Sequence, residues 1–436
     1  MTATPRVRAV VVNYRGGALT LDCLRSLVTT AWPAPALEVV LVDNASDDGV
    51  VTRVREELPV VRVIESPVNA GFGAACNLAL RDLRGVDHVA LVNNDVTVSP
   101  GWLRPLVAAL EADPGIGAAC PKILLADRFR TLTLATTTRR RGRGDRRELG
   151  IRVSGVRAGD TDLWRRVRFA DGTWGPEFGP GGEEEHYQWT AGRADLLVPA
   201  VAAGVSLHLA ADDHRHVTAS SGPTATAFAV GPEPAWYEVP LAGEPFDVIN
   251  NAGTELVADG YGADRGYLER DDGRYDVAED VFAWCAAAVV LSARYLRDVG
   301  NFDESLFLYY EDLDLAWRGR ERGWRTRYVP NSVVRHVHSA TSSRAALATT
   351  FHNERNHLLV LARHERPSSV ARAFARHLGI TVSYARRDVL APVLQGRPVR
   401  PELVRCRLRA FGSALGAIAG RTPTDAAKPL TTSGPG

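Results

Sequence analysis

The sequence predicts an α/β protein with a mainly parallel sheet, a β-rich insertion and a helical C-terminal region. Over the first 125 residues, strand-like apolar runs alternate with helical patterns, the arrangement that builds a parallel sheet covered by helices. From about residue 155 to 241, short β-type runs are separated by Gly, Pro and Asp, which is typical of an all-β insertion. Helical and mixed patterns then return and continue toward the C-terminus.

The expected strands of the first region are short apolar runs that end in polar residues: Arg8–Asn13, Leu37–Asp43, Val60–Glu65 and His88–Asn93. The helices expected between them carry apolar residues at three- and four-residue spacing: Leu19–Leu27, Gly49–Leu58, Gly73–Leu83 and Leu103–Glu111. The ligand crevice of an open α/β sheet lies at the carboxyl ends of its strands. The polar residues at those ends therefore predict a binding site.

The β-rich segment contains runs such as DLLVPAV and VSLHLA and predicts a sandwich-like insertion. A helical and mixed pattern is expected over Val281–Val290 and Leu306–Arg322, followed by one more strand, Thr326–Val329, before Pro330. The chain beyond is predicted to be helical and basic. Its tail, 420–436, is rich in Thr, Pro, Gly and Ser and is predicted to be disordered.

Composition and charge exclude several functional classes. The 52 basic and 51 acidic residues nearly cancel, so no whole-chain field attracts nucleic acid or an anionic membrane. The five cysteines show no CxxC spacing, which predicts reduced, buried thiols and neither a disulfide framework nor a zinc site. No stretch approaches the ~20 apolar residues of a membrane span. We therefore expect a cytoplasmic protein without a nucleic-acid partner, in contact with the inner face of the cell membrane at most peripherally.

Two motifs after the early strands could bind a nucleotide. Asp43 ends a strand and enters a turn with Asn44, where a carboxylate can accept hydrogen bonds from a base or a ribose; the alternative is a cap on the next helix. The segment Ser66–Asn77, with Asn69 and Gly71, starts a helix with small residues. Its backbone N–H groups could face a phosphate, although glycine-rich helix starts are also common packing devices.

A third motif, LVNNDV, suits a divalent cation. A strand that ends Asn93-Asn94-Asp95 projects Asn93 and Asp95 the same way. Mg²⁺ and Mn²⁺ prefer such hard oxygen ligands and keep substrate phosphates as further ligands; the alternative is a turn that ends the strand. His336, two residues before His338, could complete this metal site, whereas a lone histidine is usually structural.

The last motif, FLYYEDLDLAW, places Glu311, Asp312 and Asp314 directly after an aromatic block. The helix macrodipole explains acids in a first helical turn. It does not explain the aromatic residues before them, which would provide an apolar setting that raises the pKa of a carboxyl group. A carboxylate with a raised pKa can act as a general base.

In this order, VVVNYRGGALTLDCLRSL, VDNASDDG, NAGFGAACN, LVNNDV, FDESLFLYYEDLDLAWRGRERGW and VVRHVHSAT resemble the motifs of family 2 glycosyltransferases. The bacterial rhamnosyltransferase-like enzymes are the most similar members. The resemblance covers about residues 7–125 and 248–360. It implies a GT-A fold, with a Rossmann-like mixed sheet and helices on both faces. It also implies inverting transfer, dependent on Mg²⁺ or Mn²⁺, from a nucleotide-diphosphate sugar to a hydroxyl of a cell-envelope glycan or polyprenyl-linked acceptor, with dTDP-rhamnose favoured as donor.

The resemblance divides the chain into a nucleotide-sugar half, 1–125, an inserted domain, 126–247, an acceptor half, 248–345, a basic helical region, 346–419, and the tail. It assigns Asp312 as the general base, with Glu311 beside it, and Asp95 and His336 to the metal. Donor binding is assigned to Asn13, Asp43, Asn44, Asn69, Gly71, Asn93 and Asn94. Arg355-Asn356 resembles a stretch common just after the fold.

Two other functional classes stay open on the sequence. A carbohydrate-binding or scaffold protein could keep this fold without turnover. A sugar nucleotidyltransferase would show a glycine-rich basic loop after the first strand, which Asn13–Gly17 matches only in part. The insertion could bind an acceptor glycan through aromatic faces, or these residues could pack in its core: Trp164, Trp174, Tyr187, Trp189, Trp236 and Tyr237.

Overall fold

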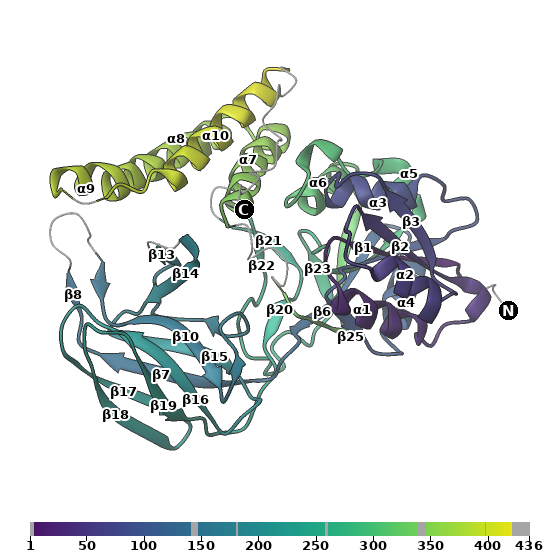
Figure 1. Cartoon of the computed structure of the whole chain (residues 1–436). Coiled ribbons are helices and arrows are strands. Elements are labelled where there is room, and N and C mark those ends of the chain that lie inside the picture. The colour runs from purple at the N-terminus through teal and green to yellow at the C-terminus, as the bar shows by residue number, and fades with distance from the viewer. Residues whose placement is uncertain are drawn as a thin grey trace. The chain divides into compact units, whose positions relative to one another are not determined.

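A computed structural model describes residues 4–140, 147–179, 182–257, 260–338, 346–396 and 398–420. The chain forms two compact units (Figure 1). The first combines Met1–Ala126, Ile249–Tyr267 and Asp272–Gly436, and the second comprises Asp127–Val248 and Leu268–Asp271. Apart from Gly420, the tail predicted to be disordered lies outside the described residues.

The first unit is built on a ten-stranded mixed sheet with the order β23-β25-β6-β24-β4-β1-β2-β3, in which β20 also pairs with β6 and β5 with β25. The parallel half consists of β1 (Val7–Asn13), β2 (Leu37–Asn44), β3 (Arg62–Ser66) and β4 (His88–Val92). The other half consists of β6 (Ile116–Leu125), β20 (Ile249–Asn251), β23 (Glu279–Val281), β24 (Ala288–Ser292) and β25 (Arg325–His336), and β5 spans Val96–Val98. Because β24 is antiparallel to both β4 and β6, the sheet is mixed.

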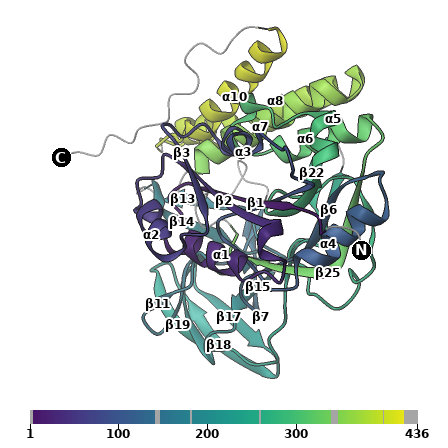
Figure 2. The same ribbon diagram turned by 90° about the vertical axis from the view of Figure 1, so that its right-hand side faces the viewer.

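Helices cover both faces of this sheet, which confirms the predicted fold class (Figure 2). One face carries α3 (Phe72–Leu80), α5 (Ala293–Val299) and α6 (Glu311–Glu321), and the other carries α1 (Ala18–Val28), α2 (Val50–Glu57) and α4 (Leu103–Ala112). Successive residues of β1 alternate between the two cores: Val10 and Val12 join one, Ala9 and Val11 the other. A strand buried on both faces in this way reads as the continuous apolar run seen in the sequence.

Two expectations about the later elements are wrong. Val281–Val290 forms no helix; it contains the end of β23 and part of β24. Its apolar residues are buried on both faces of the sheet. The spacing of apolar residues does not distinguish such a strand from a buried helix, which is why the prediction failed. The strand predicted to end at Val329 continues to His336. Its register on β6 shifts between Val329 and Val333, so Pro330 falls in an irregular stretch where its missing N–H is tolerated.

The second unit is a sandwich-like pair of antiparallel sheets, which confirms the β-rich insertion. One sheet has the order β13-β14-β10-β16-β19, with β11 on β10, and the other β12-β15-β7-β17-β18. The long strands are β7 (Phe129–Thr136), β10 (Arg152–Ala158), β14 (Gly182–Trp189), β15 (Arg193–Pro199), β16 (Gly204–Ala210), β17 (Arg215–Ser221), β18 (Thr224–Val230) and β19 (Ala235–Pro240). The short strands are β11 (Thr161–Asp162), β12 (Arg168–Phe169) and β13 (Glu177–Gly179). Apolar residues from both sheets form one core.

Packing accounts for three of the six aromatic residues of the insertion named above. Trp189 is buried, and Trp164 and Tyr237 pack against the apolar core. Trp236 is the most open of the six at 43% exposure, and its ring stacks on His208 with ring centroids 4.8 Å apart. The structure therefore supports the core-packing interpretation for Trp164, Trp189 and Tyr237, whereas Trp236 is exposed.

The C-terminal region is helical, as predicted. It comprises α7 (Ala346–His364), α8 (Pro367–Ala385), a π-helical turn at Arg386–Leu390, α9 (Ala391–Leu394) and α10 (Glu402–Ile418). Leu358–Leu361 of α7 belong to the same apolar core as α3 and α6, so this region is part of the first unit. Within the described ranges, the helices lack the combination of length and apolar character needed to span a bilayer.

Candidate functional site

Asn13 connects the carboxyl ends of the parallel strands. It is fully buried, and its register partner on β2 is Asp43. Its Nδ2 donates to Asp43 Oδ1 at 2.9 Å and to Ser46 Oγ at 2.9 Å, while its Oδ1 accepts from Thr20 Oγ1 at 2.7 Å. The hydrogen bonds of Asn13 are therefore made within the protein, and they fix the direction of the Asp43 carboxylate.

Asp48 joins this group, although sequence reasoning passed over it. Its carboxylate accepts from the backbone N–H groups of Gly17 at 3.0 Å and Val50 at 3.1 Å. Burial raises the pKa of Asp48, but these two N–H groups and Asn13 outweigh burial and bring the pKa below its usual value. Asp43 and Asp48 thus place two carboxylates beside Asn13. The run of acidic residues in DNASDDG indicates that carboxylates gather here, but the sequence does not show which of these side chains points toward Asn13.

Asn44 and Asn69 fix the loop before α3. Asn44 Oδ1 accepts from Ala70 N at 3.0 Å, and its Nδ2 donates to Asn69 Oδ1 at 2.8 Å. Gly71 follows with φ +90°, and a Cβ there would lie 2.2 Å from the carbonyl oxygen of Phe307. The N–H of Phe72 donates to that same oxygen at 2.7 Å. The predicted phosphate loop is therefore packed directly against the loop that precedes Glu311.

The Asn93-Asn94-Asp95 motif brings one carboxylate to a histidine. Asn94 Nδ2 donates to Thr20 Oγ1 at 3.1 Å, so it lies near Asn13. Asp95 Oδ1 lies 3.0 Å from His336 Nε2, because β5 pairs with β25 immediately after Asp95. Burial raises the pKa of Asp95, but His336 outweighs it, and the pKa lies below its usual value. The sequence prediction that His336 meets Asp95 agrees with this geometry.

Asp95 and His336 together offer two potential ligands to a metal cation. Nδ1 of His336 faces Asn250 Oδ1 at 2.7 Å, which leaves Nε2 directed at Asp95. Outer hydrogen bonds of this type orient metal-binding histidines. Among the residues that the structure describes, no group of three or more His, Cys, Asp or Glu could hold a metal ion. The pair therefore fits a divalent cation whose other ligands are substrate oxygens and water, as is common for Mg²⁺.

The side chains of Glu311 and Asp312, at the start of α6, lie in different surroundings. Asp312 Oδ2 accepts from Ala286 N at 3.0 Å, and Oδ1 accepts from Leu313 N at 2.8 Å. Glu311 is 5% exposed and packs toward Gly73 of α3, and within the described structure its Oε2 has no hydrogen-bond partner. Burial raises the pKa of both carboxyl groups, that of Glu311 strongly. Asp312, with two oriented oxygens, is the better placed of the two to accept a proton.

Asp264 is a second acid that sequence reasoning missed. It ends the hairpin of β21 (Thr254–Val257) and β22 (Tyr261–Asp264), and Oδ1 accepts from Asn251 Nδ2 at 2.6 Å. The charge of Asp264 contributes to the raised pKa of Asp312. The charge of His336 in turn affects the pKa of Asp264. Asp264 thus lies within electrostatic range of both the predicted base and the histidine of the predicted metal pair. No motif surrounds it in the sequence, so only the folded hairpin identifies it.

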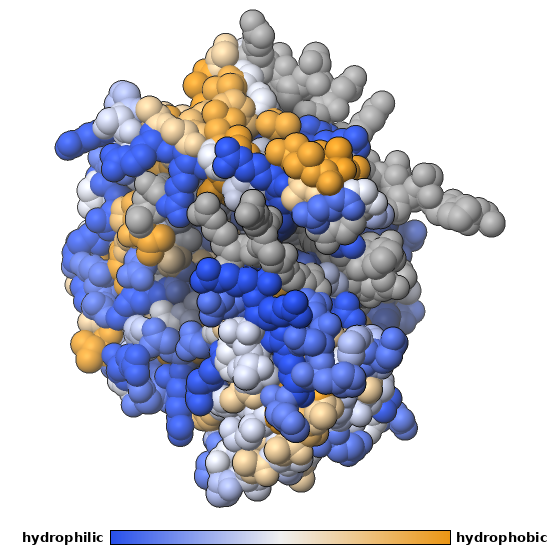
Figure 3. Space-filling model, turned by 90° about the vertical axis from the view of Figure 1, so that its left-hand side faces the viewer, coloured by the Kyte–Doolittle hydropathy of each residue, from blue (hydrophilic) through white to orange (hydrophobic). Residues whose placement is uncertain are grey.

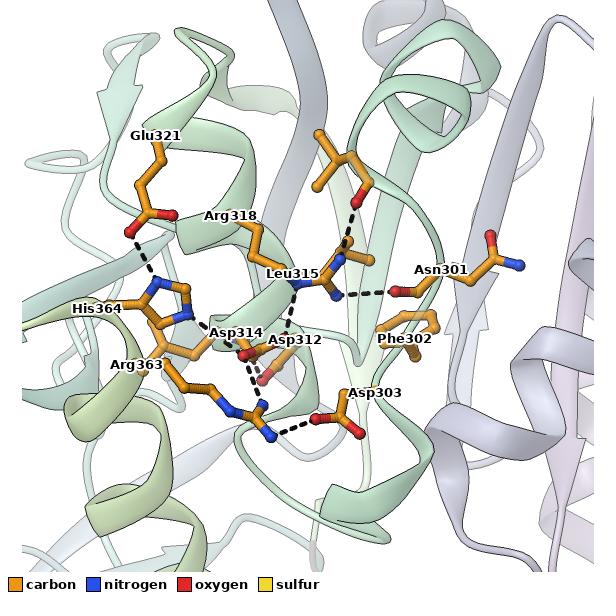
Figure 4. A network of polar contacts seen from close by, with 12 residues as sticks. Asn301, Phe302, Asp303, Asp312, Asp314, Leu315, Arg318, Glu321, Arg363 and His364 are labelled. Atoms are coloured by element: carbon orange, nitrogen blue, oxygen red, sulfur yellow. Dashed lines mark hydrogen bonds and ion pairs between the residues drawn. The ribbon is translucent and has the colours of Figure 1, made fainter. Parts of the chain in front are cut away.

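Asp314, two residues after Asp312, anchors α6 to α7 (Figure 4). Its side chain is 1% exposed and receives Arg318 Nε at 2.9 Å, Arg363 Nη1 at 3.1 Å and His364 Nε2 at 3.3 Å. Burial raises the pKa of Asp314, but His364 and the two arginines outweigh burial and lower it to about 2. His364 Nδ1 also lies 2.8 Å from Glu321. This cluster holds the helix that carries Asp312.

We expect Gly71→Ala to lower the free energy of unfolding by about 1–3 kcal/mol, because an L side chain is disfavoured at this φ and would meet the Phe307 carbonyl. Urea unfolding measures the change. Gly101→Ala is the matched control, since a Cβ there would meet nothing within 4 Å and no left-handed φ is involved; it should stay within about 0.5 kcal/mol of wild type. Equal losses in the two variants would contradict the packing of Gly71 described above.

We expect His364→Gln to destabilise the protein at low pH more than at high pH. Burial lowers the pKa of His364, but Asp314 and Glu321 outweigh it and raise the pKa above its usual value of 6.5. The charged ring therefore contributes stability that is fully present below about 6.5 and is lost as the pH rises through the folded-state pKa. Urea unfolding at several pH values between 5.5 and about 9 gives the difference from wild type. His216→Gln, at an exposed side chain, should show little difference at any pH, and a His364→Gln deficit that grows with pH would contradict this prediction.

The comparisons with known proteins agree on one family. Residues 9–166 match the model of glycosyl transferase family 2. A pre-mycofactocin glycosyltransferase of Mycobacterium tuberculosis is 47% identical over 53 residues, 12% of this chain and 11% of that protein. An N-acetylglucosaminyl-diphospho-decaprenol L-rhamnosyltransferase of the same organism is 31% identical over 93 residues, 21% of this chain and 30% of that protein. The chain thus matches less than a third of the length of these relatives.

Among solved structures, a mannosyltransferase from Pyrobaculum calidifontis in complex with GDP-Man and Mn²⁺ aligns with a TM-score of 0.42 and 16% identity, over 95% of this chain and 81% of the other. The family model includes the strands that carry Asn13, Asp43 and Asp95. The chain therefore carries a family 2 glycosyltransferase domain.

Proposed function

We propose that this protein is an inverting, metal-dependent glycosyltransferase that moves a sugar from a nucleotide-diphosphate sugar to an acceptor hydroxyl. One observation carries the proposal. Asp312, a carboxyl group with a raised pKa, lies within electrostatic range of Asp264, which in turn lies within electrostatic range of His336, the partner of Asp95. A base and a cation site at neighbouring positions are what displacement of a diphosphate by a hydroxyl requires.

In this proposal, Asp312 takes the proton of the acceptor hydroxyl as its oxygen attacks the anomeric carbon. The carbon–oxygen bond to the acceptor forms while the bond to the diphosphate breaks, and this single displacement inverts the anomeric configuration. The N–H groups of Ala286 and Leu313 hold the two oxygens of Asp312 in a fixed orientation. Asp43 and Asp48, at the ends of the parallel strands, are the candidates to accept hydrogen bonds from the nucleoside.

The metal would be Mg²⁺ or Mn²⁺ held by Asp95 and His336. The carboxylate of Asp95 suits either ion, whereas the imidazole of His336 is a ligand more typical of transition metals and so favours Mn²⁺. When bound, such a cation supplies positive charge to the departing diphosphate. Among the donor-side residues, Asn44, Asn69 and Gly71 shape the loop before α3, whereas Asn13, Asn93 and Asn94 surround the strand ends.

The donor and acceptor are proposed by analogy with the M. tuberculosis rhamnosyltransferase, whose name specifies L-rhamnose transfer to N-acetylglucosaminyl-diphospho-decaprenol. A dTDP-rhamnose-like donor is favoured, and the acceptor would be a cell-envelope glycan or a polyprenyl-linked sugar. The similarity to that protein covers 21% of this chain and 30% of that protein.

We expect Asp312→Asn to lower kcat by about 10²- to 10⁴-fold, the usual contribution of a general base, while donor affinity changes only a few-fold. Release of nucleotide from UDP-, GDP- and dTDP-sugars, with Mg²⁺ or Mn²⁺ and with a chelator, measures this. Glu56→Gln, an exposed acid on α2, is the control and should keep wild-type rates. An Asp312→Asn enzyme with full activity would contradict the assignment of the base; donor binding without turnover under all conditions would favour a carbohydrate-binding protein.

We further propose peripheral contact between the C-terminal helices and an anionic membrane. Nine of the seventeen large exposed apolar residues within the described ranges lie here: Leu378, Val382, Leu390, Val393, Leu394, Val399, Leu408, Leu415 and Ile418. Figure 3 shows apolar side chains gathered over these helices at the top of the view. Arg386, Arg405 and Arg409 are exposed among them. An apolar surface with basic neighbours suits acidic headgroups.

We expect wild type to float with vesicles that contain phosphatidylglycerol, and Val393→Asn/Leu394→Asn to float several-fold less, because it removes side chains that are 60% and 77% exposed. Val60→Asn/Val277→Asn, at equally exposed valines elsewhere, is the matched control. Light scattering without lipid detects self-association. Equal recovery of the two double variants with the floating vesicles, or no recovery of wild type with them, would contradict the membrane proposal.

A further inference from the structure

The loop Leu306–Tyr310, which leads into α6 and Asp312, has a strained backbone. Phe307, Tyr309 and Tyr310 have φ values of 57°, 67° and 71°. Positive φ is uncommon outside glycine and is least expected for bulky side chains. Such residues persist only where surrounding contacts hold them, and they gather at functional sites. The contacts that hold this loop therefore bear on the position of Asp312.

Asn356 of α7 supplies the main polar contacts. It is fully buried, and Nδ2 donates to the carbonyl oxygens of Leu306 at 2.6 Å, Leu308 at 3.0 Å and Tyr309 at 2.9 Å. Its Oδ1 accepts from Arg355 Nη1 at 2.6 Å. The two N–H bonds of this amide are thus shared among three carbonyls of the strained loop, and the Leu306 carbonyl also accepts from the N–H of Leu308. A buried carbonyl left unpaired is costly.

Aromatic contacts from the same helix hold the side chains of the loop. His352 stacks on Phe307 with ring centroids 5.0 Å apart. His357 stacks on Tyr261 at 3.6 Å and lies 5.8 Å from the ring of Tyr310. Positions 352 and 356 are one helical turn apart and face the same way. A single face of α7 therefore contacts both the backbone and the rings of the loop.

The opposite side of the loop contacts the donor half. The carbonyl oxygen of Phe307 accepts from the N–H of Phe72, and Gly71 leaves no space between the two segments. The loop is thus held between α7 and the start of α3. A displacement of the loop would move the start of α6, since Asp312 follows Tyr310 by two residues.

We propose that Asn356 is a positioning residue that holds the loop Leu306–Tyr310 in its strained conformation and thereby sets the place of Asp312. Asn356 itself contacts no predicted reacting group. Its effect on catalysis rests on the proposed function, whereas its effect on the loop does not. Misplacement of a catalytic group by about 1 Å can cost about 10²-fold in rate, so the contribution of Asn356 should be seen in kcat.

The test compares Asn356→Leu, which keeps the branching at Cγ but is larger and lacks the donor, with Leu106→Ala. Leu106 is fully buried in the core on the other face of the sheet, so its truncation destabilises the same unit without touching the loop. Hydrogen exchange of the peptide 303–315 reports on the loop, where the N–H groups of Leu308 and Asp314 are hydrogen-bonded. Single-turnover transfer at saturating donor, and its pH profile, report on Asp312.

We expect Asn356→Leu to speed exchange of this peptide about tenfold and to lower kcat about 10²-fold, with the KM for the donor changed only a few-fold. The acid limb of its pH profile should move to lower pH as water reaches Asp312. Leu106→Ala should lose thermal stability without these changes. Unchanged exchange in Asn356→Leu, a loosened loop with wild-type kcat, or equal kcat losses in both variants would overturn the proposal. If wild type transferred from no donor, the proposed function would fail, and exchange alone would decide whether Asn356 holds the loop.

Discussion

The parallel pairing of β1 with β2 and β4 is the constraint on which the site depends. Parallel strands end at the same edge of a sheet, so Asn13, Asp43 and the turn that holds Asn94 and Asp95 meet there although they are distant along the chain. The buried amide of Asn13 then fixes this edge by bonding to Asp43 and to Thr20. A buried amide left without partners would cost free energy, which explains why so many short polar side chains gather at this one position.

The second half of the sheet completes the site from distant parts of the chain. β25 returns parallel to β6 and carries His336 to Asp95. β24 lies between β4 and β6, and the backbone just before it presents the N–H of Ala286 to Asp312. Outside the sheet, α7 contacts both the loop before α6 and, through Arg363 and His364, the buried Asp314. The helical region after the sheet is therefore part of the site's support.

The acids of the site differ because their surroundings differ. Asp314 and Asp95 have cationic or imidazole partners, and their pKa values are lowered. Glu311 and Asp312 are buried without a cation beside them, and their pKa values are raised. Environments that separate the pKa values of neighbouring acids commonly separate their roles. Along α6, Asp312 is therefore suited to accept a proton, whereas Asp314 anchors the helix.

The sequence by itself determined the strands that end in polar residues, the β-rich insertion and the motif acids, because hydrophobic period and residue type are local properties. Only the tertiary structure decided that Pro330 lies within a strand and that Val281–Val290 is not helical. It also placed Asp48 beside Asn13, Asp264 within electrostatic range of Asp312, and Asn356 against the loop before α6. These residues act through partners distant along the chain or through a backbone turn, and neither leaves a periodic signal in the sequence.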